Sequence, residues 1–282
     1  MKIAFNRKCA EYMQPRHPES PERVLASYNF LKDKYEFIES KICSEENILL
    51  VHSKDLINIV KQENFSDSDM ISFPGMYQIA LLSAGSALQA MNLCLSGENT
   101  FSLMRPPGHH AGRDFLGGFC YFNNIAIAVK AAQKYKGIRK VLILDIDNHH
   151  GNGTQDIFLG DNSILYISLH QSPLYPGTGK ISEKNCLNYP LPLGTDGKTY
   201  IETLKKAMEK AKEFGPELVA VSAGFDTYKG DPITDMNLDM DTYRKIGEII
   251  KSLRKPTFAA LEGGYSKDLP LCISKFLNGL EK

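Results

Sequence analysis

The chain has 282 residues, a length within the range of one large α/β domain. Its 33 lysine and arginine residues balance its 33 aspartate and glutamate residues, so net charge does not favour nucleic acid or an anionic membrane as a partner. We therefore expect neither partner, and the composition leaves the oligomeric state open.

Few features of the sequence indicate export, membrane insertion or disulfide bonds. The apolar run at the N-terminus is too short for a signal peptide, and we expect charged residues to interrupt every later apolar stretch before it reaches bilayer length. Six scattered cysteines without a Cys-x-x-Cys pair indicate reduced, mostly buried thiols. These features predict a soluble, cytoplasmic protein.

Strand and helix patterns alternate along the chain, and no repeat or linker separates them. Ser20 is the expected N-cap of the first helix, and glycines 97, 137 and 215 are expected helix stops. In chain order, the predicted elements are a helix at 21–34, a helix at 75–95, a strand at 100–104, a helix at 123–136, strands at 140–147 and 163–170, a helix at 198–214, a strand at 217–223, a helix at 241–253 and a strand at 257–261. The alternation predicts one domain, residues 1–282, with a central, mostly parallel sheet flanked by helices.

Unusual polar residues follow the predicted strands. The loops in question are 105–110, 148–153, 171–179, 224–227 and 262–265. In an open parallel sheet, ligands bind where the carboxyl ends of the strands and their loops converge. We therefore expect these loops to form one site.

A metal site is predicted at the end of the strand VLILDIDNHHGNG, residues 141–153. Residues two apart on an extended chain point the same way, so Asp145, Asp147 and, if the strand continues, His149 share one face. Asp226, after the apolar run ELVAVSA, is the expected third ligand, which leaves one coordination position open for water. A lone loop aspartate is otherwise an Asx-turn or N-cap residue, and Asp145 is alternatively a ligand of this metal or of a second cation.

Three further side chains suit hydrolysis at a metal-bound water. His109 and His110 follow the stiff segment Arg-Pro-Pro-Gly, and two imidazoles near a metal-bound water can act as base and acid, with Asp145 as a partner for one of them. Tyr265 follows two glycines and can donate a hydrogen bond to an oxyanion. The structural alternatives are a histidine that satisfies a buried carbonyl and an ordinary surface tyrosine.

Aromatic residues can form the walls of such a site. Phe119 and Tyr175 are core aromatics by default. If they flank the metal, they make a narrow apolar slot suited to a long alkyl chain.

The motifs RPPGHHA, GFCYFNN, DIDNHHGNGTQ, SLH with PGTG, AGFDTYKGDP and EGGY, together with HPESPER near the N-terminus, occur in this order. In this the chain resembles the zinc-dependent histone deacetylase family, which includes acetoin-utilisation and acetylpolyamine amidohydrolase relatives. The resemblance spans nearly the whole chain and implies the arginase/deacetylase α/β fold.

The resemblance also implies roles for individual residues. Asp147, His149 and Asp226 match the zinc ligands, and Tyr265 matches the phenol that stabilises the oxyanion. His110 matches the general base that becomes the general acid, while His109 stays charged or hydrogen-bonded beside Asp145. Positions that match a structural K⁺ or Na⁺ site are Asp145, Ser168 and the carbonyls of Asp147, His149 and Leu169. Positions that match substrate-binding residues are Gly118, Phe119, Tyr175, Ile233 and Asp69, the last on the rim.

Particular residues refine the resemblance. Asn152, as the partner of the second histidine, is typical of class II members, and Tyr265 argues against the weakly active branch with histidine there. Ile233 stands where acetylpolyamine-selective relatives carry a gatekeeper glutamate, which favours acyl-lysine. His150 has no predicted role.

The resulting hypothesis is a zinc-dependent amidohydrolase that removes acetyl or related acyl groups from the lysine side chain in a peptide or protein. A small acylated amine such as an acetylpolyamine is the alternative substrate. A ureohydrolase, which usually needs two bridged metals, and a catalytically dead acyl-group binder are the remaining hypotheses. The acyl length and the metal used in the cell stay open.

Overall fold

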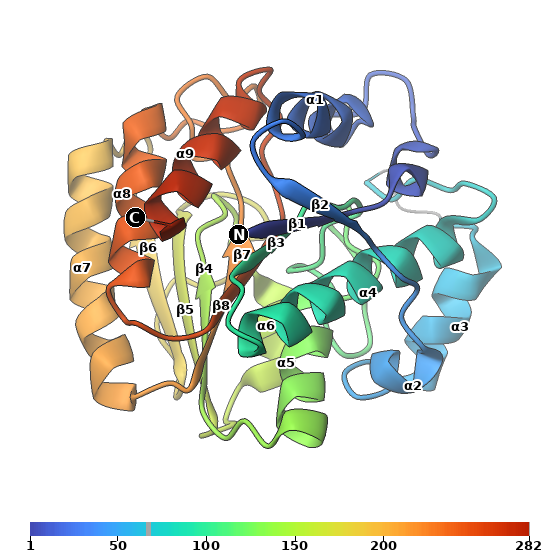
Figure 1. Cartoon of the computed structure of the whole chain (residues 1–282), viewed down its shortest axis with the longest axis horizontal. Helices are drawn as coiled ribbons and strands as arrows, with labels where there is room; N and C mark the ends of the chain where they lie inside the picture. The colour runs from blue at the N-terminus through green and yellow to red at the C-terminus, as the bar shows by residue number, and fades with distance from the viewer. Residues whose placement is uncertain (66–68, 282) are drawn as a thin grey trace.

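The computed structural model of the chain describes residues 1–65 and 69–281. Its eight described strands form one sheet in the order β2-β1-β3-β8-β7-β4-β5-β6, and every pairing between them is parallel (Figure 1). The strands are β1 Lys2–Phe5, β2 Glu36–Glu39, β3 Thr100–Ser102, β4 Val141–Asp145, β5 Ile164–Gln171, β6 Cys186–Leu191, β7 Leu218–Ala223 and β8 Thr257–Leu261. The predicted fold class, a parallel α/β sheet flanked by helices, is confirmed.

Helices cover both faces of the sheet. Figure 1 shows α7, α8 and α9 on one side and α4 and α5 on the other. The described helices are η1 Arg7–Ala10, α1 Glu22–Leu31, α2 Glu45–Ile48, α3 Lys54–Gln62, α4 Met76–Leu95, α5 Asn124–Lys136, α6 Asn152–Phe158, α7 Gly197–Phe214, α8 Met240–Lys251 and α9 Leu269–Glu281. The central strands β4, β5, β7 and β8 are buried along their whole length, which explains their continuous apolar runs.

The five predicted strands are the contiguous centre of the sheet, β3-β8-β7-β4-β5. Their carboxyl ends are therefore neighbours, and the loops after them meet at one edge. The sequence does not predict β1, β2 or β6, which lie toward the two ends of the sheet. β2 is half-exposed, and β6 contains Pro190, as only an edge strand readily tolerates.

The predicted helices are present, with one correction at a cap. Asn123 caps α5 by accepting a hydrogen bond from the Ala126 N–H, and Gly137 ends that helix in the left-handed conformation. The N-cap of α1 is Pro21, which has no side-chain acceptor, so the prediction that Ser20 caps this helix is wrong. Pro21 already has helical dihedral angles, and the backbone carbonyl of Ser20 accepts from Arg23 instead.

A second correction concerns helix α4. All 20 of its residues lack a charge, so this helix is long and apolar enough to cross a membrane, contrary to the expectation that charges interrupt every such run. Of its most apolar 18-residue window, 67% is buried inside the protein, and the helix contacts β1, β3, β8 and α5. This burial is typical of the core helix of a globular fold. The six cysteines are buried and free, as predicted.

Candidate metal centre and hydrolytic site

Asp147, His149 and Asp226 form a compact group at the carboxyl ends of β4 and β7. Ligand atoms of the three side chains all lie within 4.8 Å of one another, the only such group of His, Cys, Asp or Glu in residues 1–65 and 69–281. His149 Nδ1 lies 3.0 Å from Asp147 Oδ1 and 2.9 Å from Asp226 Oδ2. Both carboxylates are fully buried. One nitrogen and two carboxylate oxygens are the donor set of a catalytic zinc site with an open position.

Backbone N–H groups orient these carboxylates. Asp147 Oδ2 accepts from Gly263 over 2.7 Å, and Asp226 Oδ1 accepts from Asn148 over 2.8 Å. Asp226 Oδ2 is buried and accepts no hydrogen bond from a backbone N–H of the described residues, and it faces His149 Nδ1 at 2.9 Å. A buried carboxylate oxygen that faces only another ligand atom suits a metal site, because a buried charge is costly unless a cation or a donor meets it.

The ligands converge through a turn rather than along an extended strand. β4 ends at Asp145, and bends follow at residues 147–149, so the extended geometry on which the shared strand face depended does not continue to Asp147 and His149. Asp145 Oδ1 accepts from the Asp147 N–H over 3.1 Å, and Asp147 Oδ1 accepts from the His149 N–H over 2.8 Å. Each aspartate thus hydrogen-bonds the backbone two residues on, which is an Asx-turn geometry.

Gly263 lets the backbone pass directly over the metal group. A Cβ at this position would lie 2.5 Å from a carboxylate oxygen of Asp147 and 2.5 Å from one of Asp226. No side chain larger than hydrogen fits there. The glycine is therefore required by the close approach of this loop to the two carboxylates.

Electrostatics within the group favour a bound cation. Burial alone would lower the pKa of His149, but its hydrogen bonds and charge interactions with Asp147 and Asp226 raise that pKa to about 10. Burial and the charge of Asp147 raise the pKa of Asp226 to about 7. Two buried carboxylates close together stabilise positive charge between them, whether on an imidazolium or on a metal ion.

The loop of residues 105–110 after β3, here called the tandem-histidine loop, brings two histidines to the same place. The His109 and His110 rings lie 4.0 Å apart, and the His110 ring lies 6.0 Å from that of His149. His109 Nδ1 is 3.1 Å from Asp145 Oδ2, which confirms the predicted partner. His110 Nδ1 is 2.7 Å from Asn152 Oδ1 at the start of α6, so the neutral partner is also where it was expected.

The two imidazoles differ in charge. Burial opposes protonation of His109, but the charges of Asp147 and Asp145 outweigh it and raise the pKa to about 10. Burial and the positive charges of His109 and His149 lower the pKa of His110 well below its ordinary value. An Nδ1–H donated to Asn152 leaves His110 Nε2 as an unprotonated base.

Tyr265 stands on the loop of residues 262–265 after β8, here called the EGGY loop. Its backbone N–H donates to Asp231 Oδ2 over 2.7 Å, and the Arg23 guanidinium lies 4.7 Å from its ring centre. Arg23 Nε also donates to the Gly264 carbonyl over 2.7 Å. Burial raises the pKa of Tyr265 well above its ordinary value, so the phenol keeps the proton that an oxyanion would accept.

A cavity of about 210 Å³ opens over the metal group. All five residues predicted to bind substrate line it, together with four of the predicted hydrolytic residues: Gly118, Phe119, Tyr175, Ile233, Asp69, His109, His110, His149 and Tyr265. The Phe119 ring lies edge-on to Tyr265 at 6.1 Å, and the Tyr175 ring lies edge-on to His110 at 5.1 Å. Tyr175 is 45% exposed and Ile233 37%, so both belong to the mouth.

The Phe119 wall depends on an unusual backbone. Gly118 and Phe119 have φ values of +53° and +69°, a region that residues other than glycine rarely adopt. A Cβ at Gly118 would lie 2.4 Å from the His110 ring, so a side chain there is excluded. A strained non-glycine residue at a cavity wall is a feature of ligand sites.

The residues that match a monovalent-cation site lie on adjacent strands. Asp145 of β4 is in register with Ser168 of β5, and Leu169 follows in β5. Asp145 Oδ2 also accepts from the Tyr166 hydroxyl over 2.9 Å. The register brings Asp145 and Ser168 side by side, and the site itself, with its occupancy by K⁺ or Na⁺, stays a prediction.

His150, which had no predicted role, does not line the cavity. Its Nδ1 is 2.8 Å from Thr178 Oγ1, and its Nε2 is 3.1 Å from Gln155 Oε1. Burial lowers its pKa. A neutral ring held between two polar side chains has a structural role.

The sequence did not predict a buried cluster of charged side chains next to the tandem-histidine loop. Glu19 bonds Arg105 through both carboxylate oxygens, at 2.7 and 2.6 Å, and bonds Arg23 at 2.9 Å. Burial opposes the charge of Glu19, but Arg105 and Arg23 keep its pKa below the ordinary value. The cluster ties the tandem-histidine loop to the arginine that contacts Tyr265. The HPESPER segment, which contains Glu19 and Arg23, was the available signal.

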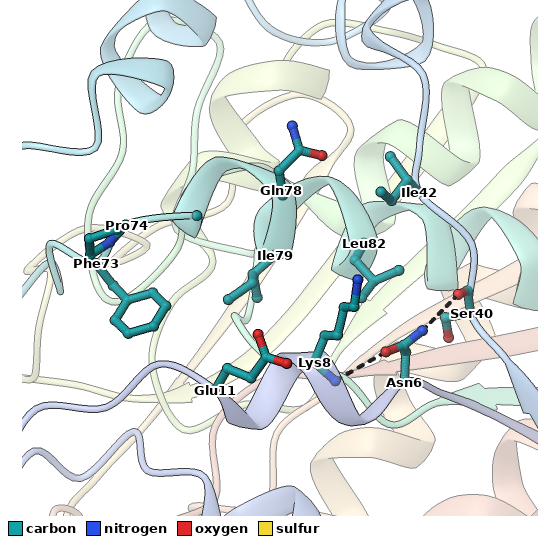
Figure 2. A pocket seen from close by; sticks show the side chains of 11 residues that line it. Asn6, Lys8, Glu11, Ser40, Ile42, Phe73, Pro74, Gln78, Ile79 and Leu82 are labelled. Carbon is teal, nitrogen blue, oxygen red and sulfur yellow. Dashed lines mark hydrogen bonds between the residues drawn. The ribbon is translucent and has the colours of Figure 1, made fainter.

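A second cavity, of about 390 Å³, lies between residues 6–11 and the N-terminal part of α4 (Figure 2). Ile79 and Leu82 form an apolar side of it, and Lys8 and Glu11 lie opposite. Its described lining shares no residue with the hydrolytic cavity. The two cavities are therefore separate.

Known proteins place the chain in a family. The histone deacetylase domain family matches residues 17–280. A probable deacetylase of Archaeoglobus fulgidus is 37% identical over 94% of this chain and 81% of its own length. Acetylpolyamine amidohydrolase 2 of Pseudomonas aeruginosa is 39% identical over 73% of this chain and 63% of its own length. The crystal structure of the HDA15 HD domain superposes with a TM-score of 0.92 at 31% identity, covering 98% of this chain and 87% of that one. With the Asp147, His149 and Asp226 group beside His110 and Tyr265, this chain belongs to the histone deacetylase domain family and is a deacetylase that hydrolyses amide bonds.

Proposed function

We propose that the protein removes acetyl or related acyl groups from the side-chain amine of lysine, with zinc as its metal. The observation that carries this proposal is the cavity itself. The cavity of about 210 Å³, with Phe119, Tyr175 and Ile233 in its lining, lies over the group formed by Asp147, His149 and Asp226. Such a cavity fits an alkyl chain that ends in a polar amide.

Asp147, His149 and Asp226 would hold the zinc ion. When bound, zinc polarises the amide carbonyl and lowers the pKa of a water molecule. The N–H groups of Gly263 and Asn148 fix one oxygen of each carboxylate, so the remaining oxygens and His149 Nδ1 face one another in a set geometry. This preorganisation holds the ligands before the metal arrives.

His110 is the proposed general base. Asn152 holds its Nδ1 proton, so Nε2 takes a proton from the attacking water and later gives it to the leaving amine. His109 lies next to it, and Asp145 and Asp147 stabilise its positive charge. A charged His109 keeps the pKa of His110 low, which makes return of the proton to the amine favourable.

Tyr265 is the proposed oxyanion donor. Its phenol keeps its proton, and Asp231 and Arg23 fix the backbone and the ring of this residue. The developing negative charge on the former carbonyl oxygen would accept the hydrogen bond. The benefit is greatest in the transition state, where that charge is largest.

A small acylated amine is the second candidate substrate. The relative from Pseudomonas aeruginosa described above is named an acetylpolyamine amidohydrolase, and Asp69 gives the cavity one acidic group that attracts a cationic amine. Ile233 favours the lysine substrate, because an apolar side chain at the mouth offers no attraction to a polyamine charge.

The test compares substrates on zinc-loaded protein, with chelated protein as the control. We expect the kcat/KM for acetyl-lysine peptides to exceed that for acetylated polyamines, with about one zinc per chain. A higher value for the polyamines would favour the second substrate. Hydrolysis of neither class by zinc-loaded protein would contradict the proposal, and a metal content near two per chain would favour a ureohydrolase.

A further inference from the structure

We propose that Glu262 is a positioning residue that holds the tandem-histidine loop and the EGGY loop in the relative placement that hydrolysis needs. This role rests on the proposed function. Glu262 follows β8 directly, and its side chain is fully buried. It does not line the hydrolytic cavity, so it acts through the residues that do.

The side chain of Glu262 bonds the backbone of the other loop. Its Oε2 accepts from the Gly108 N–H over 2.7 Å and from the His109 N–H over 3.1 Å. These are the two N–H groups immediately before the imidazoles. A single carboxylate oxygen therefore restrains the backbone that positions the two histidines relative to the metal group.

The backbone of Glu262 is fixed as well. Its N–H donates to the Ala223 carbonyl at the end of β7 over 3.0 Å, and its carbonyl accepts from the Arg23 guanidinium. The next residue, Gly263, donates to Asp147. Glu262 and Gly263 together thus connect the tandem-histidine loop, the metal ligand Asp147 and the arginine that contacts Tyr265.

Stability alone does not account for this residue. The second oxygen, Oε1, is buried and bonds no described residue. Burying a carboxylate with one oxygen unpartnered is unfavourable, and natural folds keep such arrangements chiefly where function needs them. We infer that the reach of the carboxylate to both N–H groups is what the site requires.

Two substitutions distinguish the effect of the side-chain length of Glu262 from the effect of its charge. Glu262→Asp keeps the charge but shortens the side chain by one methylene, which withdraws the acceptor from both N–H groups. Glu262→Gln keeps the reach and an acceptor oxygen but loses the charge. Glu217→Asp is the control for shortening a glutamate that accepts a backbone N–H, because Glu217 Oε2 accepts from the Arg139 N–H over the same 2.7 Å at the exposed amino-terminal end of β7, away from the site.

The measurements are kcat, KM, zinc content and melting temperature on an acetyl-lysine peptide. We expect Glu262→Asp to lose on the order of tenfold or more in kcat per bound zinc, with KM little changed, because a displaced base lowers turnover before it lowers binding. Glu262→Gln should keep most of the wild-type kcat even where its melting temperature falls. Glu217→Asp should match the wild type.

Two results would overturn the role of Glu262. One is a wild-type kcat in Glu262→Asp, and the other is an equal loss in Glu262→Gln and Glu262→Asp. In both cases the active wild type would leave the proposed function intact. An inactive zinc-loaded wild type would instead refute the proposed function, and the role of Glu262 with it.

Discussion

His52 makes the stability of this protein depend on pH in a way that can be measured. Its Nδ1 donates to the Gly112 carbonyl over 2.8 Å, and its Nε2 accepts from the Asn123 N–H over 2.9 Å. These bonds connect the chain just after the tandem histidines to the N-cap of α5, and they need a neutral ring. Burial lowers the pKa of His52 to about 4.

The magnitude follows from the difference between the folded and unfolded pKa. The unfolded chain has the ordinary histidine pKa of 6.5, so the contribution of His52 is fully present above that pH and is lost as pH falls toward about 4. At pH 5 the unfolded state is almost fully protonated at this residue and the folded state is not. The free energy of unfolding then loses about 2 kcal/mol relative to pH 8.

The assay is urea unfolding, followed by circular dichroism, of the wild type and His52→Gln at pH 8 and pH 5. Glutamine keeps a donor and an acceptor but does not titrate. The loss between the two pH values should be smaller in the variant by about 2 kcal/mol. Other titrating groups, including His170 with a pKa lowered to about 3 mainly by burial, occur in both proteins and cancel. An equal pH dependence in the two proteins would refute the reasoning.

Three other substitutions test the site. Tyr265→Phe should keep zinc but lose on the order of a hundredfold in kcat, as expected for one oxyanion donor; near-normal turnover would remove the role of the phenol. Asp226→Ala should release the metal, and one zinc per chain in that variant, measured by atomic absorption, would exclude Asp226 as a ligand. Ile233→Glu should raise the kcat/KM ratio of an acetylated polyamine to an acetyl-lysine peptide by about threefold, because a carboxylate at an exposed mouth attracts a cation weakly; an unchanged ratio would place the substrate charge elsewhere.

The centre of the fold and the metal group are predictable from the sequence because their signals are local. Apolar runs mark the central strands, and Asp147 and His149 stand two residues apart directly after one of them. The strand-end rule then adds Asp226 without knowledge of the strand order. Local sequence patterns do not show that Asx turns, rather than an extended strand, orient the side chains of Asp147 and His149.

Partners far apart in the chain could not be predicted. Arg23 bonds the Glu262 carbonyl across 239 residues, and Glu262 bonds Gly108 across 154. A single sequence gives no indication of such pairs, because each depends on how distant strands are ordered in the sheet. The outer strands β1 and β2 were not predicted for another reason. They have four residues each, too few for a period to be recognised, and no loop rich in Gly, His, Asp or Pro comes directly after them as one does after β3.

The place of β8 has a consequence for synthesis and folding. β8 is the last strand in the chain, yet it lies between β3 and β7 near the middle of the sheet. Until β8 emerges from the ribosome, no strand pairing joins the group β2-β1-β3 to the group β7-β4-β5-β6. Neither group contains a complete site. Closure of the sheet therefore waits for non-local contacts, which are slow to form. We expect hydrolytic activity to arise in a single late step, when the β8 segment inserts and brings Tyr265 to the histidines.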